Sequence, residues 1–208
     1  MTIFGWILLF FLTIRLIVSF VNFIWTYLVR RELSNYCNAK ENEPMPSWSI
    51  LIPARNEENS IGNLLEDIIK LNDKPCEIII YDDNSTDYTR DIVMEYQKRL
   101  PELRLIEGDL PEGWLGKNNG CHKLAAVAKG NYLLFLDADV RIDSNLATKY
   151  LNYALSNNLS LLSIFPNQIL ENRDSKISTP IMNWILLSLL PLPLVKNCSW
   201  SSFSAANG

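Results

Sequence analysis

Two patterns of hydrophobic and polar positions divide the chain. Residues 3–29 are almost continuously apolar, and Arg15 is the only charged side chain among them. After a polar segment that contains Pro44 and Pro46, short apolar runs alternate with amphipathic stretches of helical period. Such alternation is typical of an α/β domain whose parallel sheet is covered by helices on both faces. We therefore expect one long N-terminal helix, followed by a linker and a Rossmann-like α/β domain.

The second pattern predicts the individual elements of that domain. Apolar runs rich in β-branched and aromatic residues predict five strands, over residues 49–52, 77–81, 103–106, 132–136 and 159–165. Apolar positions three and four residues apart predict one helix that Ser60 can cap and another that begins at Thr86 or Asp87. Two more helices are expected over residues 117–129 and 144–156.

The N-terminal apolar stretch is long enough to span a membrane. A helix over residues 3–29 would measure about 40 Å, whereas the hydrocarbon core of a bilayer is about 30 Å thick. A central Arg15 costs about 2.5–3.5 kcal/mol, but each Leu, Ile, Phe or Val returns about 0.3–0.6 kcal/mol, and the stretch holds 18 of these. The alternative is a cleaved signal peptide, which would show a basic start and a small-residue cleavage site. The sequence favours an anchor over residues 1–31 and a linker over residues 32–48.

The charges are distributed unevenly along the chain. The first 40 residues carry four basic side chains and one acidic side chain, a net charge of +3, and the remaining 168 carry 15 basic and 22 acidic side chains, a net charge of −7. Arg30 and Arg31 directly follow the apolar stretch, so the positive-inside rule places the domain on the cytoplasmic side of the cell membrane. A domain at −7 is a poor partner for nucleic acid.

Cysteine and histidine give no sign of a zinc site. The four cysteines contain no C-x-x-C pair, and His122 is the only histidine. The wide spacing of the cysteines also argues against a disulfide framework, in agreement with a reducing compartment.

Polar and acidic clusters follow three of the expected strands. The runs PARNEE (residues 53–58), DDNSTD (residues 82–87) and Asp137-Ala138-Asp139 come after the first, second and fourth strands. In open parallel sheets, ligands bind beyond the carboxyl ends of the strands. We therefore expect the three clusters to line one crevice.

Each cluster suits a particular kind of ligand. Asp137 and Asp139, one residue apart at the end of an extended strand, could share Mg²⁺ or Mn²⁺, which prefer carboxylate and diphosphate oxygens; a bare D-x-D is otherwise an ordinary turn. Asp82 and Asp83 could accept hydrogen bonds from a base or a ribose, or form an Asx-turn before the next helix. Lys117 could meet a phosphate near a helix N-terminus.

The remaining polar residues are less specific. Asn56 and Glu57 suit ribose and base contacts, although alone they are an ordinary polar loop. The segment around Lys117 is not a phosphate-binding P-loop, because Asn118 follows the lysine where that motif needs Ser or Thr. The chain also has no G-x-G-x-x-G, which argues against a dinucleotide oxidoreductase.

Together, PARNEE, IIIYDDNSTD and GWLGKNNGCHKLAAVAKGNYLLFLDADV resemble the family 2 inverting glycosyltransferases of the A-type nucleotide-sugar fold. The resemblance covers residues 49–208, and the N-terminal helix and the W-x-G-K segment make it most similar to membrane-bound bacterial branches associated with carotenoids or hopanoids. It implies a nucleotide diphosphate sugar donor, UDP-linked, a metal ion and a lipid or polyisoprenoid acceptor. An enzyme that glycosylates a polyprenyl phosphate, and a non-catalytic remnant that binds nucleotide sugar, remain the alternatives.

The resemblance also implies roles for individual residues. The nucleoside pocket and the donor diphosphate and sugar would be held by Pro53, Arg55, Asn56, Glu57, Asp83, Lys117 and Asp137. Asp139 would bind the metal. The catalytic base of this family lies in a later segment, so we expect it after Gly208 and expect the chain to be part of a longer enzyme. The apolar residues 181–195 are interrupted by two prolines and are expected to form an interfacial helix or, alternatively, a buried core helix.

Overall fold

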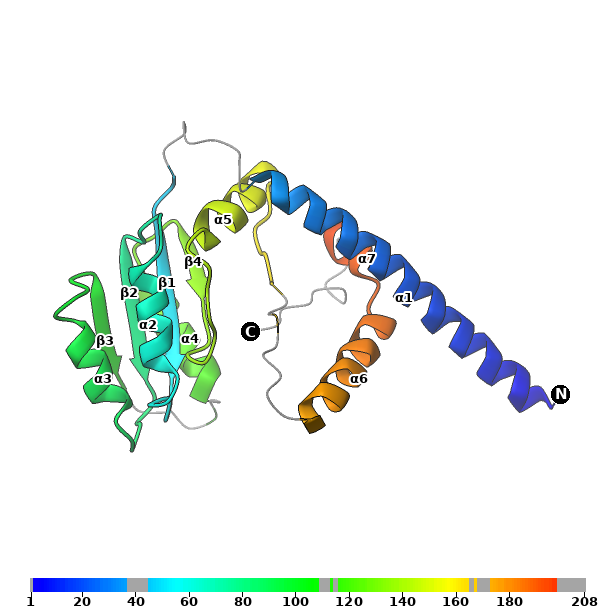
Figure 1. Cartoon of the computed structure of the whole chain (residues 1–208), viewed down its shortest axis with the longest axis horizontal. Helices are drawn as coiled ribbons and strands as arrows, with labels where there is room; N and C mark the ends of the chain where they lie inside the picture. The colour runs from blue at the N-terminus through cyan, green and yellow to red at the C-terminus, as the bar shows by residue number, and fades with distance from the viewer. Residues whose placement is uncertain are drawn as a thin grey trace. The chain divides into compact units, whose positions relative to one another are not determined.

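The computed structural model describes residues 2–36, 45–108, 113, 116–164, 167 and 173–197. Within these residues the chain forms two compact units. One unit, called the sheet unit below, contains the four strands and helices α2–α5; the other, called the helical unit, contains α1, α6 and α7 (Figure 1).

The sheet of the sheet unit is parallel throughout. Its strands are β1 (Trp48–Ala54), β2 (Glu77–Asp82), β3 (Leu103–Glu107) and β4 (Tyr132–Phe135), in the order β3-β2-β1-β4. The central strands β1 and β2 are almost wholly buried, because both of their faces are covered. This arrangement confirms the predicted Rossmann-like fold class.

Helices cover both faces of the sheet (Figure 1). They are α2 (Ile61–Ile69), α3 (Thr89–Tyr96), α4 (Gly116–Val127) and α5 (Leu146–Ser156). Since side chains alternate along a strand, Ile50 and Ile80 pack with the apolar side chains of α2 and α3, while Leu51 and Ile79 pack against Leu124 of α4. The alternation of apolar strands and amphipathic helices therefore predicted the two-sided core correctly.

Several local predictions differ from the structure. The strand expected over residues 159–165 is not formed by residues 159–164, which lie outside any ladder; residue 165 lies outside the described residues. Leu161 is 69 % exposed, and a run that is not buried has no reason to pair. Ser60 occupies the N-cap position of α2 but makes no side-chain cap. Helix α3 begins two residues after Asp87, whose carboxylate accepts hydrogen bonds from Thr89.

The helical unit consists of one long helix and two shorter ones. Helix α1 (Ile3–Tyr36) continues through residues 32–36, which were expected in the linker. Helices α6 (Arg173–Leu189) and α7 (Leu192–Asn197) both contact α1. The apolar segment 181–195 is thus two helices with a break at Pro191, and it belongs to the unit of α1 although we expected it in a domain over residues 49–208.

Candidate functional site

A cleft of about 460 Å³ lies at the carboxyl ends of β1, β2 and β4, within the sheet unit. Parallel strands end at one edge of the sheet, so loops that are far apart in sequence meet there. Seven of the eight predicted site residues line the cleft: Pro53, Arg55, Glu57, Asp83, Lys117, Asp137 and Asp139. Ala54, Tyr81, Gly116 and Ala138 complete the lining.

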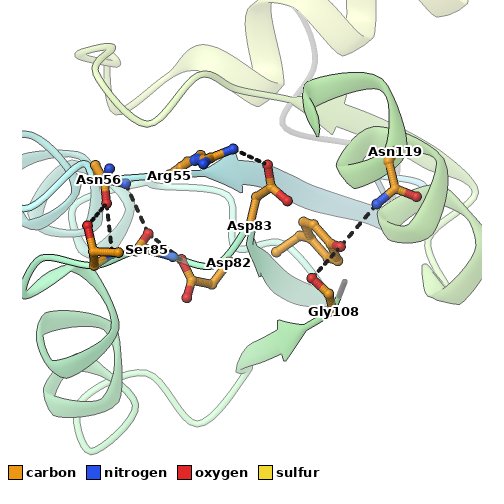
Figure 2. Close-up of polar contacts among 9 residues, drawn as sticks. Arg55, Asn56, Asp82, Asp83, Ser85, Gly108 and Asn119 are labelled. Carbon is orange, nitrogen blue, oxygen red and sulfur yellow. Dashed lines mark hydrogen bonds and ion pairs between the residues drawn. The ribbon is translucent and has the colours of Figure 1, made fainter. Parts of the chain in front are cut away.

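Asn56, the eighth predicted residue, braces two loops and is not part of this lining. Its backbone N donates to Ser85 Oγ over 2.9 Å, and its side-chain Oδ1 accepts a hydrogen bond from Thr86 N over 2.8 Å (Figure 2). Its φ of 56° lies in the left-handed region, which Asn tolerates better than most residues. Asn56 therefore joins the loop after β1 to the loop after β2.

The two acidic residues after β2, Asp82 and Asp83, have different partners. The Oδ1 of Asp82 accepts hydrogen bonds from the backbone N and the Oγ of Ser85, three residues on, and so holds the loop before α3; the expected Asx-turn would have its donor two residues on. Asp83 instead lines the cleft and pairs with Arg55, with 3.4 Å between Nη1 and Oδ2 (Figure 2). The second acid of the pair is thus the one that is available to a ligand.

The acidic pair after β4 lies beyond the end of the strand. Strand β4 ends at Phe135, Asp137 comes between the strand and a turn, and Ala138 and Asp139 form that turn. Ala138 is buried in the apolar core, whereas Asp137 and Asp139 line the cleft. The two carboxylates therefore reach the same space, as predicted, although neither residue belongs to the strand.

Ion pairs hold this acidic segment at both ends. Lys117 Nζ lies 2.7 Å from Asp137 Oδ1 across the cleft. Behind the cleft, the guanidinium of Arg141 donates two hydrogen bonds, of 2.6 and 2.7 Å, to the buried carboxylate of Asp67 on α2. These hydrogen bonds hold the pKa of Asp67 below its ordinary value. The turn with Asp137 and Asp139 is thereby fixed to α2.

Negative charge accumulates at one end of the cleft. Burial raises the pKa of Glu57, and the charges of Asp139 and Asp137 raise it further. Hard carboxylate oxygens of this kind fit Mg²⁺ or Mn²⁺. Among the described residues, however, no three His, Cys, Asp or Glu side chains converge as a ready-made ligand set. An ion held here would need further oxygens, such as those of a diphosphate.

The sequence analysis assigned no role to Tyr81 and Gly116, which also line the cleft. The Tyr81 hydroxyl donates to Gly108 O over 3.0 Å and accepts a hydrogen bond from Asn119 Nδ2 over 3.1 Å, and the ring is fully buried (Figure 2). A Cβ added at Gly116 would overlap the carboxylate of Asp83. Tyr81 gave a signal in the sequence, because it is an aromatic residue at the end of the apolar run 77–81. Gly116 gave none, because its role depends on a contact between distant segments.

The whole set of strand-end residues falls within a match to a known family. Residues 49–200 match the model described as "Glycosyl transferase family 2". The chain belongs to glycosyl transferase family 2. The sheet unit contains most of the matched residues, and the cleft lies inside the matched region.

Two curated relatives that the chain matches share one name. The chain is 30 % identical over 142 residues to the 4,4'-diaponeurosporenoate glycosyltransferase of Staphylococcus haemolyticus, and the match covers 67 % of this chain and 37 % of that protein. It is 35 % identical over 125 residues to the enzyme of the same name from Staphylococcus aureus, covering 59 % of this chain and 32 % of that protein. The match thus spans about a third of the length of these relatives.

Solved structures with a similar arrangement are more distant in sequence. The structure titled S. aureus TarS 1-349 in complex with UDP-GlcNAc is 23 % identical, covers 60 % of this chain and 37 % of that chain, and gives a TM-score of 0.47. A mannosyltransferase from Pyrobaculum calidifontis in complex with GDP-Man and Mn²⁺ is 19 % identical, covers 68 % of this chain and 43 % of that chain, and also gives 0.47.

Proposed function

We propose that this chain is the donor-binding part of a membrane-anchored glycosyltransferase. It would bind a nucleotide diphosphate sugar, UDP-linked, and pass the sugar with inversion to a lipid or polyisoprenoid acceptor. The observation that carries the proposal is the single cleft at the ends of β1, β2 and β4, which gathers cationic and acidic side chains from four segments of a family 2 domain.

The two cations of the cleft are suited to the donor diphosphate. Lys117 and Arg55 each face a carboxylate in the cleft, Asp137 and Asp83 respectively, and each has about half or more of its side chain exposed. A cation in such a pair can turn to a phosphate at little cost, because an exposed ion pair contributes only about 0–1 kcal/mol. Asp83, whose own side chain is largely buried, would then accept hydrogen bonds from the base.

The acidic end of the cleft would hold the metal. Asp139 would be its protein ligand, with Asp137 beside it on the ribose or the sugar, and the donor diphosphate would supply further oxygens. When bound, the divalent ion would supply Lewis acidity to the departing diphosphate. The turn that carries both carboxylates is fixed by Arg141 and Asp67, so their positions do not depend on the ligand.

Two observations support a membrane location and a lipid acceptor. Residues Ile3–Ser34 of α1 form a helix that is long and apolar enough to cross a membrane, and only 6 % of its 18-residue apolar stretch is buried within the molecule. The relatives are named as diaponeurosporenoate glycosyltransferases, which supports a carotenoid-acid type of acceptor. In the proposed orientation Arg30 and Arg31 keep the sheet unit in the cytoplasm.

Titration calorimetry with UDP and Mn²⁺ on the full chain in detergent tests the donor site. We expect Mn²⁺ to strengthen UDP binding at least tenfold in the wild type and in Asp91→Asn, which removes an exposed carboxylate on α3. In Asp139→Asn the effect of Mn²⁺ should disappear. Equal Mn²⁺ dependence in all three proteins would overturn the metal assignment.

A product assay separates the proposed activity from its alternatives. Membranes that hold the chain are given radiolabelled UDP-sugar and either a polyisoprenoid carboxylic acid or a polyprenyl phosphate. Label on the carboxylic acid supports the proposal, and label on the phosphate favours the alternative acceptor. That the general base lies in a segment after Gly208 stays a prediction. If UDP binds but neither acceptor is labelled, even when the later segment of a relative is supplied, the donor-binding remnant is favoured.

A further inference from the structure

Polar side chains of α1 gather on one face, inside an otherwise apolar helix. Arg15, Ser19 and Asn22 are separated by four and three residues, which places them on the same side of a helix. Arg15 and Asn22 both contact α6, and Asn22 is only 2 % exposed. The apolar side chains around them point outward: Phe20 and Phe23 are 62 % and 73 % exposed.

The side chain of Asn22 satisfies backbone groups at the corner between α6 and α7. Its Nδ2 donates to the carbonyls of Leu187 and Leu190, both over 2.6 Å, and its Oδ1 accepts a hydrogen bond from the N of Leu192 over 2.8 Å. Carbonyls at the end of one helix and N–H groups at the start of the next have no partner within their helices. One side chain thus replaces the water that such a corner needs at a protein surface.

Side chains of α6 also contact the guanidinium of Arg15. Its Nε and Nη2 donate to Ser188 Oγ over 3.1 and 2.6 Å, and its guanidinium lies 4.7 Å from the centre of the Trp184 ring. Cations gain from the face of an aromatic ring most where water is excluded. An arginine in water would need neither the hydrogen bonds to Ser188 nor the contact with Trp184, because water solvates its guanidinium.

These contacts lie near the middle of the apolar helix. Arg15 and Asn22 are each about 5 Å along the axis from the midpoint of Ile3–Ser34, at 1.5 Å per residue. If that helix crosses a bilayer, both groups lie well inside a hydrocarbon core of about 30 Å. At that depth non-helical backbone is tolerated only where protein satisfies it, and Asn22 does so at the α6–α7 corner.

We propose that α6 and α7 form a re-entrant element, which enters the apolar layer of the membrane beside α1 and turns at the depth of Asn22. The proposal rests on the anchoring role proposed for α1. It also assigns an occupant to the exposed side of α6, where Ile181, Trp184, Ile185 and Leu189 are 42–65 % exposed. These side chains continue the apolar surface of α1, so lipid acyl chains cover both.

Spin-label depth measurements on the full chain in nanodiscs test this element. In a background whose four native cysteines are replaced by serine, a label is placed at Leu189→Cys on α6, at Phe20→Cys on α1 or at Met94→Cys on α3. Accessibility to oxygen relative to a water-soluble nickel complex then reports depth. We expect Leu189 to match Phe20, with a ratio at least tenfold above that of Met94.

The reference sites separate failure of this proposal from failure of the anchor. A water-like label at Phe20 would overturn the anchor and the re-entrant element together. A lipid-like label at Phe20 with a headgroup-like or water-like label at Leu189 would overturn the re-entrant element alone, in favour of the interfacial helix. Low accessibility to both reagents at Leu189 would also overturn it, because it would place a second copy of the chain on this face.

A substitution tests the role of Asn22 directly. Asn22→Leu removes all three hydrogen bonds of the corner, and we expect the label at Leu189 to move at least 3 Å toward the headgroups. Thr13→Val is the matched control, since Thr13 donates only to Leu9 O within α1, and should leave the depth unchanged. An unchanged depth in both variants would mean that Asn22 does not hold the corner in the membrane.

Discussion

The sheet unit and the helical unit place polar and apolar side chains in opposite ways. In the sheet unit, Ile50 and Ile79 are fully buried, and carboxylates gather around an open cleft. In the helical unit, apolar side chains of α1 face outward and Asn22 is buried. The difference is the one expected if the helical unit lies in a membrane, as proposed above: water favours apolar cores, whereas an apolar layer requires that polar groups be satisfied inside.

The largest expected difference between the two units is the effect of truncating one isoleucine in each. Ile79→Ala, at a fully buried site in β2, should lower the free energy of unfolding by about 2–5 kcal/mol, because it leaves a cavity. Ile17→Ala, at a site on α1 that is 56 % exposed, should change it little. Urea unfolding of the full chain in detergent, followed by amide hydrogen exchange in β1 and β2, measures both. Equal losses would mean that α1 is packed like a core helix.

The ion pair behind the cleft gives the sheet unit a pH dependence. Because Arg141 lowers the pKa of Asp67, the pair stabilises the fold above the ordinary Asp value near 3.8, and this contribution is lost as the pH falls through the lowered value. Asp67→Asn should therefore cost about 1–2 kcal/mol at pH 7, a figure reduced because Arg141 is half exposed.

The difference between Asp67→Asn and the wild type should shrink below about pH 4, which unfolding curves from pH 2 to pH 7 would measure. The adjacent Glu66→Gln is the control. Its ion pair with Arg99 is more exposed than that of Asp67, and the glutamine amide can still accept the hydrogen bond of Tyr96, so the change should matter little. A loss for Asp67→Asn that stays constant down to pH 2 would contradict the linkage.

The close approach of Gly116 on α4 to Asp83 can be tested with two glycine substitutions. Gly116→Ala would force the carboxylate of Asp83 to move, so we expect UDP affinity to fall at least tenfold in calorimetry, about 1.4 kcal/mol. Gly62→Ala is the matched control. Its Cβ would meet Ile92 and Tyr96 at ordinary distances of 3.8 and 3.9 Å, so it should leave binding unchanged and stabilise α2 by about 0.5–1 kcal/mol. Equal affinities would show that Asp83 does not contact the donor.

Much of the sheet unit could be predicted because its signals are local. The run over residues 77–81 is apolar because both faces of β2 are covered, and the polar clusters lie where strands end. The run over residues 159–164 has a similar composition but forms no strand. An apolar run indicates that its burial is favourable, but it does not indicate whether a partner strand lies beside the run.

What sequence reasoning missed depends on contacts between distant residues. Tyr81 bonds to Gly108 and Asn119, which are 27 and 38 positions away, and Asn22 bonds to Leu187, 165 positions away. Asn22 looked like one polar residue in an apolar run, because its partners are backbone groups that any sequence has. Periodicity carries no information on such pairs.

The smallest expected effects come from the same substitution made once in each unit. In the sheet unit, the buried Ser49 donates to Glu77 Oε1 over 2.8 Å and accepts a hydrogen bond from Gly130 N over 2.9 Å. Ser49→Ala should therefore cost about 1 kcal/mol in urea unfolding, since it removes a satisfied hydroxyl and leaves its partners short of a bond.

In the helical unit, Ser19 on α1 has a buried Oγ without a hydrogen-bond partner among the described residues. Ser19→Ala removes a hydroxyl whose burial is uncompensated, so it should stabilise the packing of α1 with α6 by about 0.5 kcal/mol. Unfolding of the full chain by SDS in mixed micelles measures this packing, and a change of less than half that size for Thr13→Val serves as the control. Destabilisation by Ser19→Ala would mean that this hydroxyl is satisfied in the membrane and that the polar face of α1 extends beyond Arg15 and Asn22. A gain for Ser19→Ala beside a loss for Ser49→Ala is the outcome that the opposite organisation of the two units requires.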